Sequence, residues 1–334
     1  MKAIIPVAGA GTKLRPHTYT QPKALIPLAG KTILSIIVDQ LKEANVKEFI
    51  FIIGYLGEKI QQYVTQTYPN LTCHFIQQNE RHGTGHAIRL TKDIVGDDEA
   101  FIVLGDTIAE FSVSEIINAP FSMVGIKKVD DPRNFGVAEM DDDGFISRVV
   151  EKPAIPKSNM ALVGVYKIKE TLLLFDCLQK LIDSNFKKYD EFSITDALEC
   201  MIENGAKIRT FKVENWFDCG KKESLLQSNA IMLKKFSQPP VESNNFQNTI
   251  FVPPVSIGTG CLIKNSVIGP NVAVGEHTMI NNAIIKDSII GSYSNLVEIV
   301  LNNSLIGSDA EVKGSSRHLN IGDNTAIDLG GGTK

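Results

Sequence analysis

Apolar stretches alternate with helically spaced apolar residues along the first two thirds of the chain. A short apolar run, Lys2–Val7, leads into a glycine-rich loop, and Ile33–Ala44 has its aliphatic residues at helical spacing with Thr32 placed to cap the helix. Strands that alternate with helices predict a mostly parallel sheet covered by helices. Ligands of such sheets bind at the carboxyl ends of the strands. The other predicted elements are strands over Glu48–Ile53, Thr72–Ile76, Ala100–Leu104 and Lys207–Val213, and helices over Glu58–Thr65 and Gly85–Ile94.

A change of composition divides the chain near residue 240. The stretch Phe236–Pro254 holds four prolines among polar residues, which is typical of a linker. We therefore expect one domain over residues 1–235, a linker over residues 236–254 and a second domain over residues 255–330.

The second domain carries a repeated phrase. Asn265–Gly269 (NSVIG), Asp287–Gly291 (DSIIG) and Asn303–Gly307 (NSLIG) follow one another at spacings of 22 and 16 residues. Between them an aliphatic residue is repeatedly followed by a small or polar one, in a rhythm of about six residues. Three such hexads form one turn of a triangular parallel β-helix, with the aliphatic residue inside. We expect roughly four turns, and a few ordinary β-hairpins are the alternative.

Composition and charge narrow the classes of function. The chain has 334 residues, 43% of them hydrophobic and 22% charged, so it can bury a large core. Its formal net charge of −4 argues against nucleic-acid binding, which needs a basic surface. No apolar stretch approaches the ~18 residues of a transmembrane helix, and the apolar start is too short for a signal peptide. The scattered cysteines lack a zinc-like spacing and favour a reducing cytoplasm; they are Cys73, Cys177, Cys200, Cys219 and Cys261.

The loop after the first strand, Val7–Pro16 (VAGAGTKLRP), is the first candidate site. Its glycines let the backbone approach a phosphate, and free backbone N–H groups there form an anion-binding nest. The loop lacks the third glycine of the dinucleotide fingerprint and the Gly-Lys-Ser/Thr of a P-loop. By itself it fits a tight turn as well as a phosphate site.

An aspartate follows each of two predicted strands. Asp106 ends the segment Leu104-Gly105-Asp106, and Asp218 lies in Asn215–Gly220 (NWFDCG), after the strand Lys207–Val213. A carboxylate at a strand end points into the cleft, where it can hold Mg²⁺ against phosphate oxygens. A capping or turn aspartate is the alternative interpretation of Asp106.

The continuation of the glycine loop resembles a known family. The pattern G-x-G-T-[basic]-L-x-P-x-T is followed by P-K-x-L-x-P within residues 20–31 (TQPKALIPLAGK). This pattern resembles the sugar-1-phosphate nucleotidylyltransferases, which join a nucleoside triphosphate to a sugar 1-phosphate and release pyrophosphate. The resemblance covers essentially the whole chain, because a left-handed β-helix is common after such a domain. It implies an α/β fold, a Rossmann-like mixed-sheet nucleotidyltransferase domain followed by a left-handed parallel β-helix, in a homo-oligomer.

The resemblance also implies roles at the predicted cleft. Mg²⁺ is the expected cofactor, held by Asp106 and Asp218 together. Lys13 and Arg15 are expected to hold the leaving pyrophosphate, and Lys23 one of the two reacting phosphates. The expected nucleotide-binding residues are Ala8, Gly9, Gly11, Thr12, Gln78, Gly83 and Thr84.

Three further segments resemble the sugar pocket of the family: Asn134–Val137, Glu151–Pro153 and Leu162–Tyr166. In that resemblance Glu151 accepts hydroxyl hydrogens, and Lys152 meets the sugar phosphate. A surface ion pair is the alternative interpretation of these two residues. The expected sugar-phosphate-binding residues are Gly136, Glu151, Lys152 and Val163.

The motifs leave the branch of the family open. Gln78–Ala87 resembles the base-recognition loop, and a glutamine amide has donor and acceptor faces that suit uracil or thymine. The opening motif and Trp216–Gly220 resemble glucose-1-phosphate thymidylyltransferases of the long type, whereas Gly83–Ala87 resembles uridylyltransferases. Lys13 stands where the family usually has arginine. A lysine ammonium supplies only a point charge, whereas a planar guanidinium can hold two phosphate oxygens at once. We expect this difference to affect the rate of the reaction and not its type.

We therefore expect an enzyme that transfers a nucleotidyl group from dTTP or UTP to a sugar 1-phosphate, with glucose 1-phosphate as the expected acceptor. The alternatives are a mannose-1-phosphate guanylyltransferase and a non-catalytic regulatory subunit that binds sugar nucleotides. A third alternative, acyl transfer by the β-helix, is disfavoured by a short solenoid whose histidines are only His277 and His318. The expected partners are the triphosphate and the sugar phosphate, with no nucleic acid and no membrane.

Overall fold

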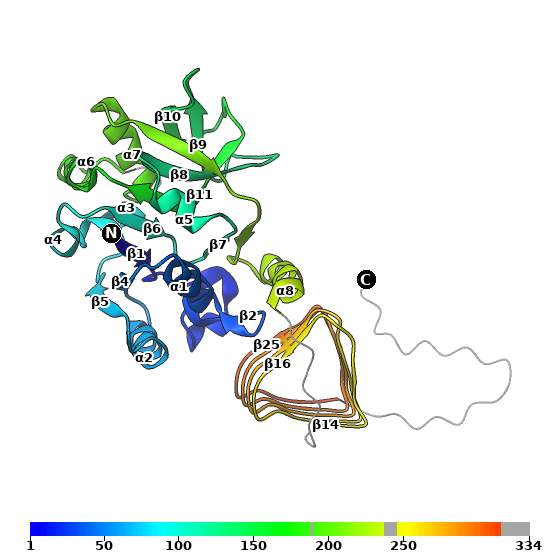
Figure 1. Cartoon of the computed structure of the whole chain (residues 1–334). Coiled ribbons are helices and arrows are strands. Elements are labelled where there is room, and N and C mark those ends of the chain that lie inside the picture. Colours follow the sequence, from blue (N-terminus) through cyan, green and yellow to red (C-terminus); the bar gives the residue numbers. More distant parts are fainter. Residues whose placement is uncertain (188–189, 237–245, 315–334) are drawn as a thin grey trace. The chain divides into compact units, whose positions relative to one another are not determined.

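The computed structural model describes residues 1–187, 190–236 and 246–314, apart from the side chain of Asp218. The chain divides into two compact units, Met1–Gln238 and Pro239–Lys334. Figure 1 shows layered helices and strands in the first unit and triangular coils in the second. His318 and the end of the predicted solenoid, residues 315–330, lie outside the described residues.

The first unit is built on a mixed sheet, as the family resemblance implies. β1 runs parallel to β4 and β6, and β4 runs parallel to β5. β11 runs antiparallel to β6, β8 and β9, so the mostly parallel sheet that the pattern alone predicts is wrong for this half. β9 and β10 are joined by a short turn, a connection that only antiparallel strands allow. The described strands of the sheet follow the order β10-β9-β11-β6-β1-β4-β5, with β8 beside β11 and β12 beside β8. Their bounds are β1 Lys2–Pro6, β4 Glu48–Ile53, β5 Thr72–Gln77, β6 Ala100–Val103, β8 Ser122–Lys128, β9 Gly136–Met140, β10 Ile146–Glu151, β11 Met160–Ile168 and β12 Ile208–Lys212.

The parallel half of the sheet is buried on both faces. The five residues of β4 from Phe49 to Ile53 are all buried, which explains why this stretch is apolar at every position instead of alternating. Figure 1 shows helices on either side of these strands. None of the described helices is long and apolar enough to cross a membrane. The helices are α1 Ile33–Glu43, α2 Gly57–Thr67, α3 Thr84–Arg89, α4 Lys92–Val95, α5 Val113–Ile117, α6 Thr171–Asp183, α7 Ile194–Glu203 and α8 Lys222–Phe236.

Two predicted helices show how far local signals reach. The Ser35 N–H donates to Thr32 Oγ1 at 3.0 Å, which confirms Thr32 as the cap of α1. The helix expected over Gly85–Ile94 is instead broken into α3 and α4. Thr91 lies at the break, fully buried, and its hydroxyl donates to the Ile88 carbonyl at 2.8 Å. A threonine that bonds back to the preceding turn competes with the helical ladder, so the helix ends there.

A small antiparallel pair lies beside the ends of the central strands. β7 (Thr107–Ala109) pairs with β13 (Trp216–Asp218), and the backbone of Asp218 is opposite Thr107. Gly105 lies against the end of β1, where its N–H donates to the Pro6 carbonyl at 3.2 Å. Segments more than 100 residues apart therefore meet at the carboxyl edge of the sheet. A second short pair, β2 Pro27–Leu28 and β3 Lys31–Thr32, precedes α1.

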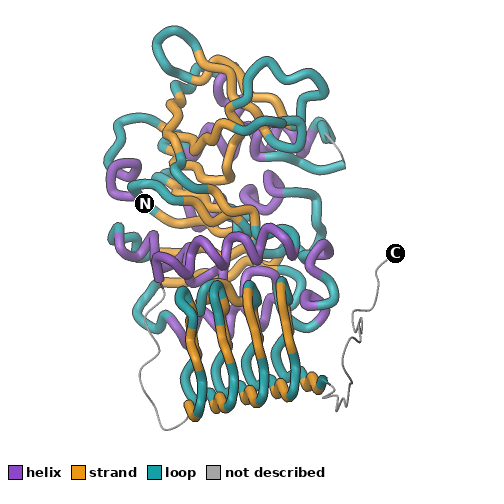
Figure 2. Tube along the Cα trace, turned by 90° about the vertical axis from the view of Figure 1, so that its right-hand side faces the viewer, coloured by secondary structure: helices purple, strands orange, loops and turns teal. Residues whose placement is uncertain are grey.

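The second unit is a coil of stacked parallel strands, consistent with the expected left-handed β-helix (Figures 1 and 2). The inward ladder Phe246, Ile263, Ile280, Leu296 and Val312 shows a turn of 17 and then 16 residues, shorter than three full hexads. Pairing begins inside the stretch interpreted as a linker, because β14 and β15 already belong to the coil. The three faces are formed by β14-β17-β20-β23-β26, β15-β18-β21-β24 and β16-β19-β22-β25. The strand bounds are β14 Phe246–Gln247, β15 Ile250–Phe251, β16 Val255–Ile257, β17 Leu262–Lys264, β18 Val267–Ile268, β19 Val272–Val274, β20 Met279–Asn281, β21 Ile284–Lys286, β22 Ile289–Ile290, β23 Asn295–Val297, β24 Val300–Asn302, β25 Leu305–Ile306 and β26 Glu311–Lys313.

The repeated phrase marks a corner of the coil and not a particular face. The first copy leads into β18, whereas the second and third copies lead into β22 and β25 on another face. In every copy the opening Asn or Asp has a positive φ of 47–49°. The serine that follows donates to the carbonyl two residues back, at 2.6–3.0 Å. Asn and Asp tolerate this backbone better than other non-glycine residues, and the serine satisfies a carbonyl at the bend.

Candidate active site

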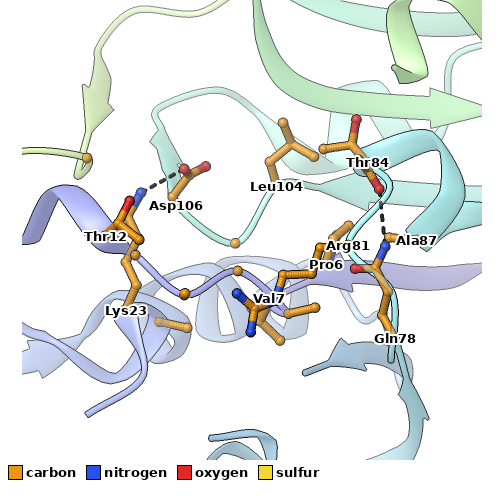
Figure 3. Close-up of a pocket in the computed structure, with 18 of the residues that line it drawn as sticks. Pro6, Val7, Thr12, Lys23, Gln78, Arg81, Thr84, Ala87, Leu104 and Asp106 are labelled. Carbon is orange, nitrogen blue, oxygen red and sulfur yellow. Dashed lines mark hydrogen bonds and ion pairs between the residues drawn. The ribbon is translucent and has the colours of Figure 1, made fainter. Parts of the chain in front are cut away.

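Two adjoining cavities open at the carboxyl ends of β1 and β6. The first has a volume of about 530 Å³ and is lined by the glycine loop, the loop after β5 and the start of α3. The second has a volume of about 270 Å³ and is lined by β9, β11 and the start of α7. Figure 3 shows the first cavity between Lys23 with Asp106 on one side and Gln78 on the other. The residues that line both cavities are Thr84, Leu104, Asp106 and Glu191.

The cavities collect most of the residues that the motifs singled out. Lys13, Lys23 and Asp106 line the first cavity. Arg15 is absent from the described lining of both cavities, and its guanidinium lies 4.9 Å from the centroid of the Tyr19 ring. The predicted nucleotide-binding residues in the first cavity are Ala8, Gly9, Gly11, Thr12, Gln78, Gly83 and Thr84. The predicted sugar-phosphate-binding residues in the second are Gly136, Glu151, Lys152 and Val163.

The glycine loop is packed against the lysine that follows it in sequence. Gly11 has a φ of 59°, and a Cβ atom there would lie 2.9 Å from Lys23 Cβ and 3.0 Å from Thr18 Cγ2. The Gly11 carbonyl accepts from the Thr18 hydroxyl at 2.9 Å and from the Leu14 N–H at 2.9 Å. Only glycine fits this backbone and this space, so the loop can pack closely against Lys23 and Thr18 while it lines the cavity.

An ion pair lies where the two cavities meet. Lys23 Nζ is 2.7 Å from Asp106 Oδ2, and the two side chains are 16% and 47% exposed. Figure 3 shows this contact at one end of the first cavity. Lys23 is predicted to contact phosphate and Asp106 to contact a metal ion, whereas in the structure the two side chains contact each other. A cation and a carboxylate are thus held together at the junction, each within reach of an incoming ligand.

The donor set suits a hard cation that is shared with phosphate. Asp106 supplies a half-exposed carboxylate, and β13 brings the backbone of residue 218 beside β7, one residue from Asp106. The side chain of Asp218 lies outside the described residues. Within the described part of the chain, no three His, Cys, Asp or Glu side chains gather into a complete metal site. Carboxylate oxygens completed by phosphate oxygens and water are the usual environment of Mg²⁺, so the residues fit this ion.

Gln78 lies at the opposite end of the first cavity. Its side chain is buried, 7% exposed, and its amide nitrogen donates to the Gly83 carbonyl at 3.3 Å. Gly83 has a φ of 95°, and a Cβ atom there would lie 2.6 Å from the Phe192 carbonyl oxygen. The glycine therefore lets this loop approach the segment before α7 closely.

The second cavity is lined by a carboxylate that is largely, but not fully, buried. Glu151 is 15% exposed in its side chain, and its Oε2 accepts from the Thr195 hydroxyl at 2.7 Å. Its Oε1 lies 3.6 Å from Lys152 Nζ, so the two residues do form an ion pair, but Glu151 faces the cavity and not the surface. Gly136 lies across from them, where a Cβ atom would be 2.8 Å from Thr195 Oγ1. Burial raises the pKa of the adjacent Tyr166, and the charge of Glu151 adds to this effect.

Several polar residues of the cavities are not among the predicted site residues. Arg81 and Lys221 add positive charge to the first cavity, Thr195 orients Glu151, and Glu191 lines both cavities. Figure 3 shows Arg81 extending from its loop across the cavity. Thr195 and Glu191 lie at the start of α7, where Ser193 caps the helix by accepting from the Thr195 N–H at 3.1 Å. That capping serine is the one local signal for this segment.

Comparisons with known proteins match this chain over the part that holds the cavities. The family model described as "Nucleotidyl transferase" matches residues 2–235. The "Bifunctional protein GlmU" of Methanococcus maripaludis is 37% identical over 319 residues, which cover 94% of this chain and 72% of that protein. The glucose-1-phosphate thymidylyltransferase of Streptomyces antibioticus is 29% identical over 93% of this chain and 86% of its own length.

Another relative matches a smaller part of this chain and of its own length. The low-salt glycan biosynthesis nucleotidyltransferase Agl11 of Haloferax volcanii is 35% identical over 242 residues. The aligned residues cover 70% of this chain and 66% of that relative. Among solved structures, a candidate glucose-1-phosphate thymidylyltransferase from Bacillus anthracis superimposes with a TM-score of 0.60 at 27% identity, over 69% of this chain and 94% of that one. A UDP-glucose pyrophosphorylase with bound UDP-glucose has a TM-score of 0.61 at 23% identity, over 70% of this chain and 98% of its own, and shares the fold.

Proposed function

Since the chain belongs to the nucleotidyl transferase family, and within it to the sugar-1-phosphate nucleotidyltransferases, we propose that it transfers a nucleotidyl group from dTTP or UTP to glucose 1-phosphate and releases pyrophosphate. The observation that carries the proposal is the pair of adjoining cavities that share Asp106. One cavity has a buried amide for a base and a glycine loop for phosphates. The other has a buried carboxylate for sugar hydroxyls. Their shared wall is where a triphosphate and a sugar phosphate would meet.

The reaction requires two anions to meet in line. An oxygen of the sugar phosphate attacks the α-phosphorus, and the bond to the leaving pyrophosphate breaks on the opposite side. The attacking oxygen is already ionised, so no general base and no covalent enzyme intermediate are needed. The protein's task is positioning and charge stabilisation, as in other phosphoryl-group chemistry.

Lysines at three places would hold the phosphates. Lys13 lies in the first cavity with the glycine loop and would hold the leaving pyrophosphate. Lys23 would exchange Asp106 for the phosphate at the reacting centre, and Lys152 would hold the sugar phosphate from the second cavity. Mg²⁺, when bound by Asp106 and Asp218, supplies charge neutralisation on the phosphate oxygens. Arg15 has no assigned contact here, because it lies over Tyr19.

A substrate panel tests the proposal. Pyrophosphate release is measured for dTTP, UTP, CTP, GTP and ATP, each with glucose, mannose and N-acetylglucosamine 1-phosphates, in Mg²⁺ and in EDTA. We expect dTTP and UTP to react with glucose 1-phosphate and EDTA to abolish the reaction. A clear preference for GTP with mannose 1-phosphate would move the protein to the guanylyltransferase branch. No release with any pair would favour the regulatory subunit that binds without turnover.

Lys13 gives a matched pair of variants for the same assay. Lys13→Ala removes a charge beside the phosphates and should lower kcat by ~10²-fold or more, as the loss of one preorganised donor does. Lys13→Arg keeps the charge and adds a planar fork, so its activity should equal or exceed that of the wild type. Equal activity of all three proteins would remove Lys13 from the site.

A further inference from the structure

The orientation of the Gln78 amide is set by a residue of the same segment that has no predicted role. Gln78 Nε2 donates to the Gly83 carbonyl at 3.3 Å and faces His86 Nδ1 at 3.1 Å. His86 lies on α3, one turn beyond the loop that lines the cavity. Both amide protons thus have partners within the protein. Figure 3 shows the amide oxygen on the other side of the group, toward the cavity.

The partners determine which end of the amide faces inward. A carbonyl oxygen only accepts, so the group opposite Gly83 must be the NH₂ end of Gln78. The second amide proton then needs an acceptor, which His86 Nδ1 supplies only when the ring is neutral and carries its proton on Nε2. In a cationic His86, the Nδ1–H group would face the NH₂ group of Gln78, so two donors would oppose each other. Turning the amide over would bring its oxygen against the Gly83 carbonyl instead.

We propose that His86 is a positioning residue, which presents the Gln78 oxygen to the base and makes the site select bases that carry a ring N–H on the facing edge. This inference rests on the proposed function. Thymine and uracil carry N3–H, which donates to an inward oxygen, whereas cytosine N3 and adenine N1 are acceptors and are repelled by it. Guanine carries N1–H, so this device does not exclude it, and the size of the cavity must do so.

The surroundings of His86 keep its ring neutral. Burial lowers the pKa of His86, the nearby His82 lowers it further, and Glu80 opposes the shift. The His82 ring meets the His86 ring edge-on at 5.3 Å, and His82 Nε2 lies 2.8 Å from Glu80 Oε2. The geometry thus places His82 between Glu80 and the His86 ring, and burial remains the largest cause of the lowered pKa of His86.

The loop before α7 completes this environment. The Phe192 ring meets the His82 ring edge-on at 6.3 Å, and Lys187 Nζ lies 5.0 Å from the centroid of the Phe192 ring. The Phe192 N–H donates to the His82 carbonyl at 2.8 Å. Glu191 lines the same cavity. A lysine and a glutamate thus lie on the loop that packs against His82, and the hydrogen bond from Phe192 holds the two loops together.

Two variants of His86 separate positioning from bulk. His86→Asn keeps an acceptor, because its Oδ1 occupies about the place of the histidine Nδ1, whereas His86→Leu has similar size and no acceptor. The measurement is the ratio of Kd for CTP to Kd for UTP, by calorimetry without sugar phosphate, followed by KM and kcat for UTP. We expect His86→Leu to lower the selectivity for UTP over CTP by ~10-fold or more, because one amide proton of Gln78 is left buried and unpaired. The KM for UTP should rise, with little change in kcat. His86→Asn should restore most of the selectivity.

The proposal would be overturned if His86→Leu and His86→Asn had equal selectivity for UTP over CTP. It would also be overturned if His86→Leu kept the selectivity of the wild type. A second readout does not depend on nucleotide use or on either variant folding. ¹⁵N NMR of the wild-type histidines at neutral pH should show His86 with its proton on Nε2 and an unprotonated Nδ1. A proton on Nδ1 would also overturn the proposal. If neither pyrimidine triphosphate binds while the tautomer is as expected, the proposed function has failed and the positioning of Gln78 has not.

The same hydrogen bond makes a pH profile informative. The pKa of His86 is lowered from the ordinary value of 6.5, so the ring gains a proton only at a pH below 6.5. UTP affinity should therefore be constant above pH 6.5 and should fall at lower pH, once the ring is protonated. CTP affinity should change less, and His86→Leu should remove the difference between the two nucleotides. The same dependence in His86→Leu as in the wild type would assign the titration to another group.

Discussion

Replacement of Thr195 by valine tests the second cavity most directly. The Thr195 hydroxyl donates to Glu151 Oε2 at 2.7 Å, and the threonine itself is 3% exposed. Valine has nearly the same shape but puts a methyl group against the carboxylate. The backbone N–H of Thr195, which caps α7 through Ser193, is unaffected by the change. The helix should therefore persist while Glu151 loses the bond that orients it.

The size of the effect follows from the burial of the carboxylate. A hydrogen bond to a charged group contributes about 1.5–3 kcal/mol, and the 15% exposure of Glu151 lets water replace part of it. The lower half of that range corresponds to a ~10-fold to 40-fold loss at 1.4 kcal/mol per factor of ten. Lys152 Nζ, 3.6 Å from the other oxygen, would still hold the carboxylate in the cavity.

The assay measures kcat/KM for glucose 1-phosphate at saturating nucleotide, and Kd for the nucleotide alone. We expect Thr195→Val to lower kcat/KM for the sugar phosphate by the stated factor and to leave nucleotide Kd unchanged, because Thr195 lines only the second cavity. Thr195→Ser keeps the hydroxyl and should retain most activity. Equal losses in valine and serine variants would mean that packing matters and the hydrogen bond does not. A larger effect on nucleotide binding than on the sugar phosphate would refute the division between the cavities.

Three further outcomes are expected. Asp106→Asn removes the partner of Lys23 and a proposed metal ligand, so pyrophosphate release should fall by ~10²-fold or more with an unchanged circular dichroism spectrum; near-normal kcat at saturating Mg²⁺ would rule out the metal assignment. Gly83→Ala places a Cβ atom 2.6 Å from the Phe192 carbonyl at a φ of 95°, so it should lower stability by about 1–3 kcal/mol in urea titrations and weaken UTP binding; unchanged stability would show that the loop relaxes freely. Ile285→Ala opens a cavity in the core of the solenoid, where Ile285 is fully buried beside Ile268 of the previous turn, and should cost about 2–5 kcal/mol in the unfolding of the second unit; wild-type stability would count against an inward position of Ile285.

Local signals in the sequence were enough to predict several of the elements and the motifs that follow them. The apolar run Glu48–Ile53 is a strand because a segment buried on both faces leaves no place for polar side chains. Thr32 caps α1 through a hydrogen bond that spans three residues. Apart from Arg15, and from Asp218, whose side chain lies outside the described residues, the residues expected for the two cavities line them, since motifs that follow strands meet at one edge of a sheet. The repeated phrase of the second unit is visible in the sequence because each bend needs an Asn or Asp with a positive φ followed by a serine that bonds within the bend.

Only the tertiary structure decided how those pieces act on one another. The ion pair of Lys23 with Asp106 joins residues 83 apart, and the bond of Thr195 to Glu151 joins residues 44 apart. Neither contact has a periodic or local signature, because each depends on where two separate elements pack. The face on which each copy of the phrase lies depends on the length of the turns between copies. The inward end of the Gln78 amide depends on a carbonyl and a ring nitrogen that the fold brings to it, and the chemistry of that end decides what the cavity accepts.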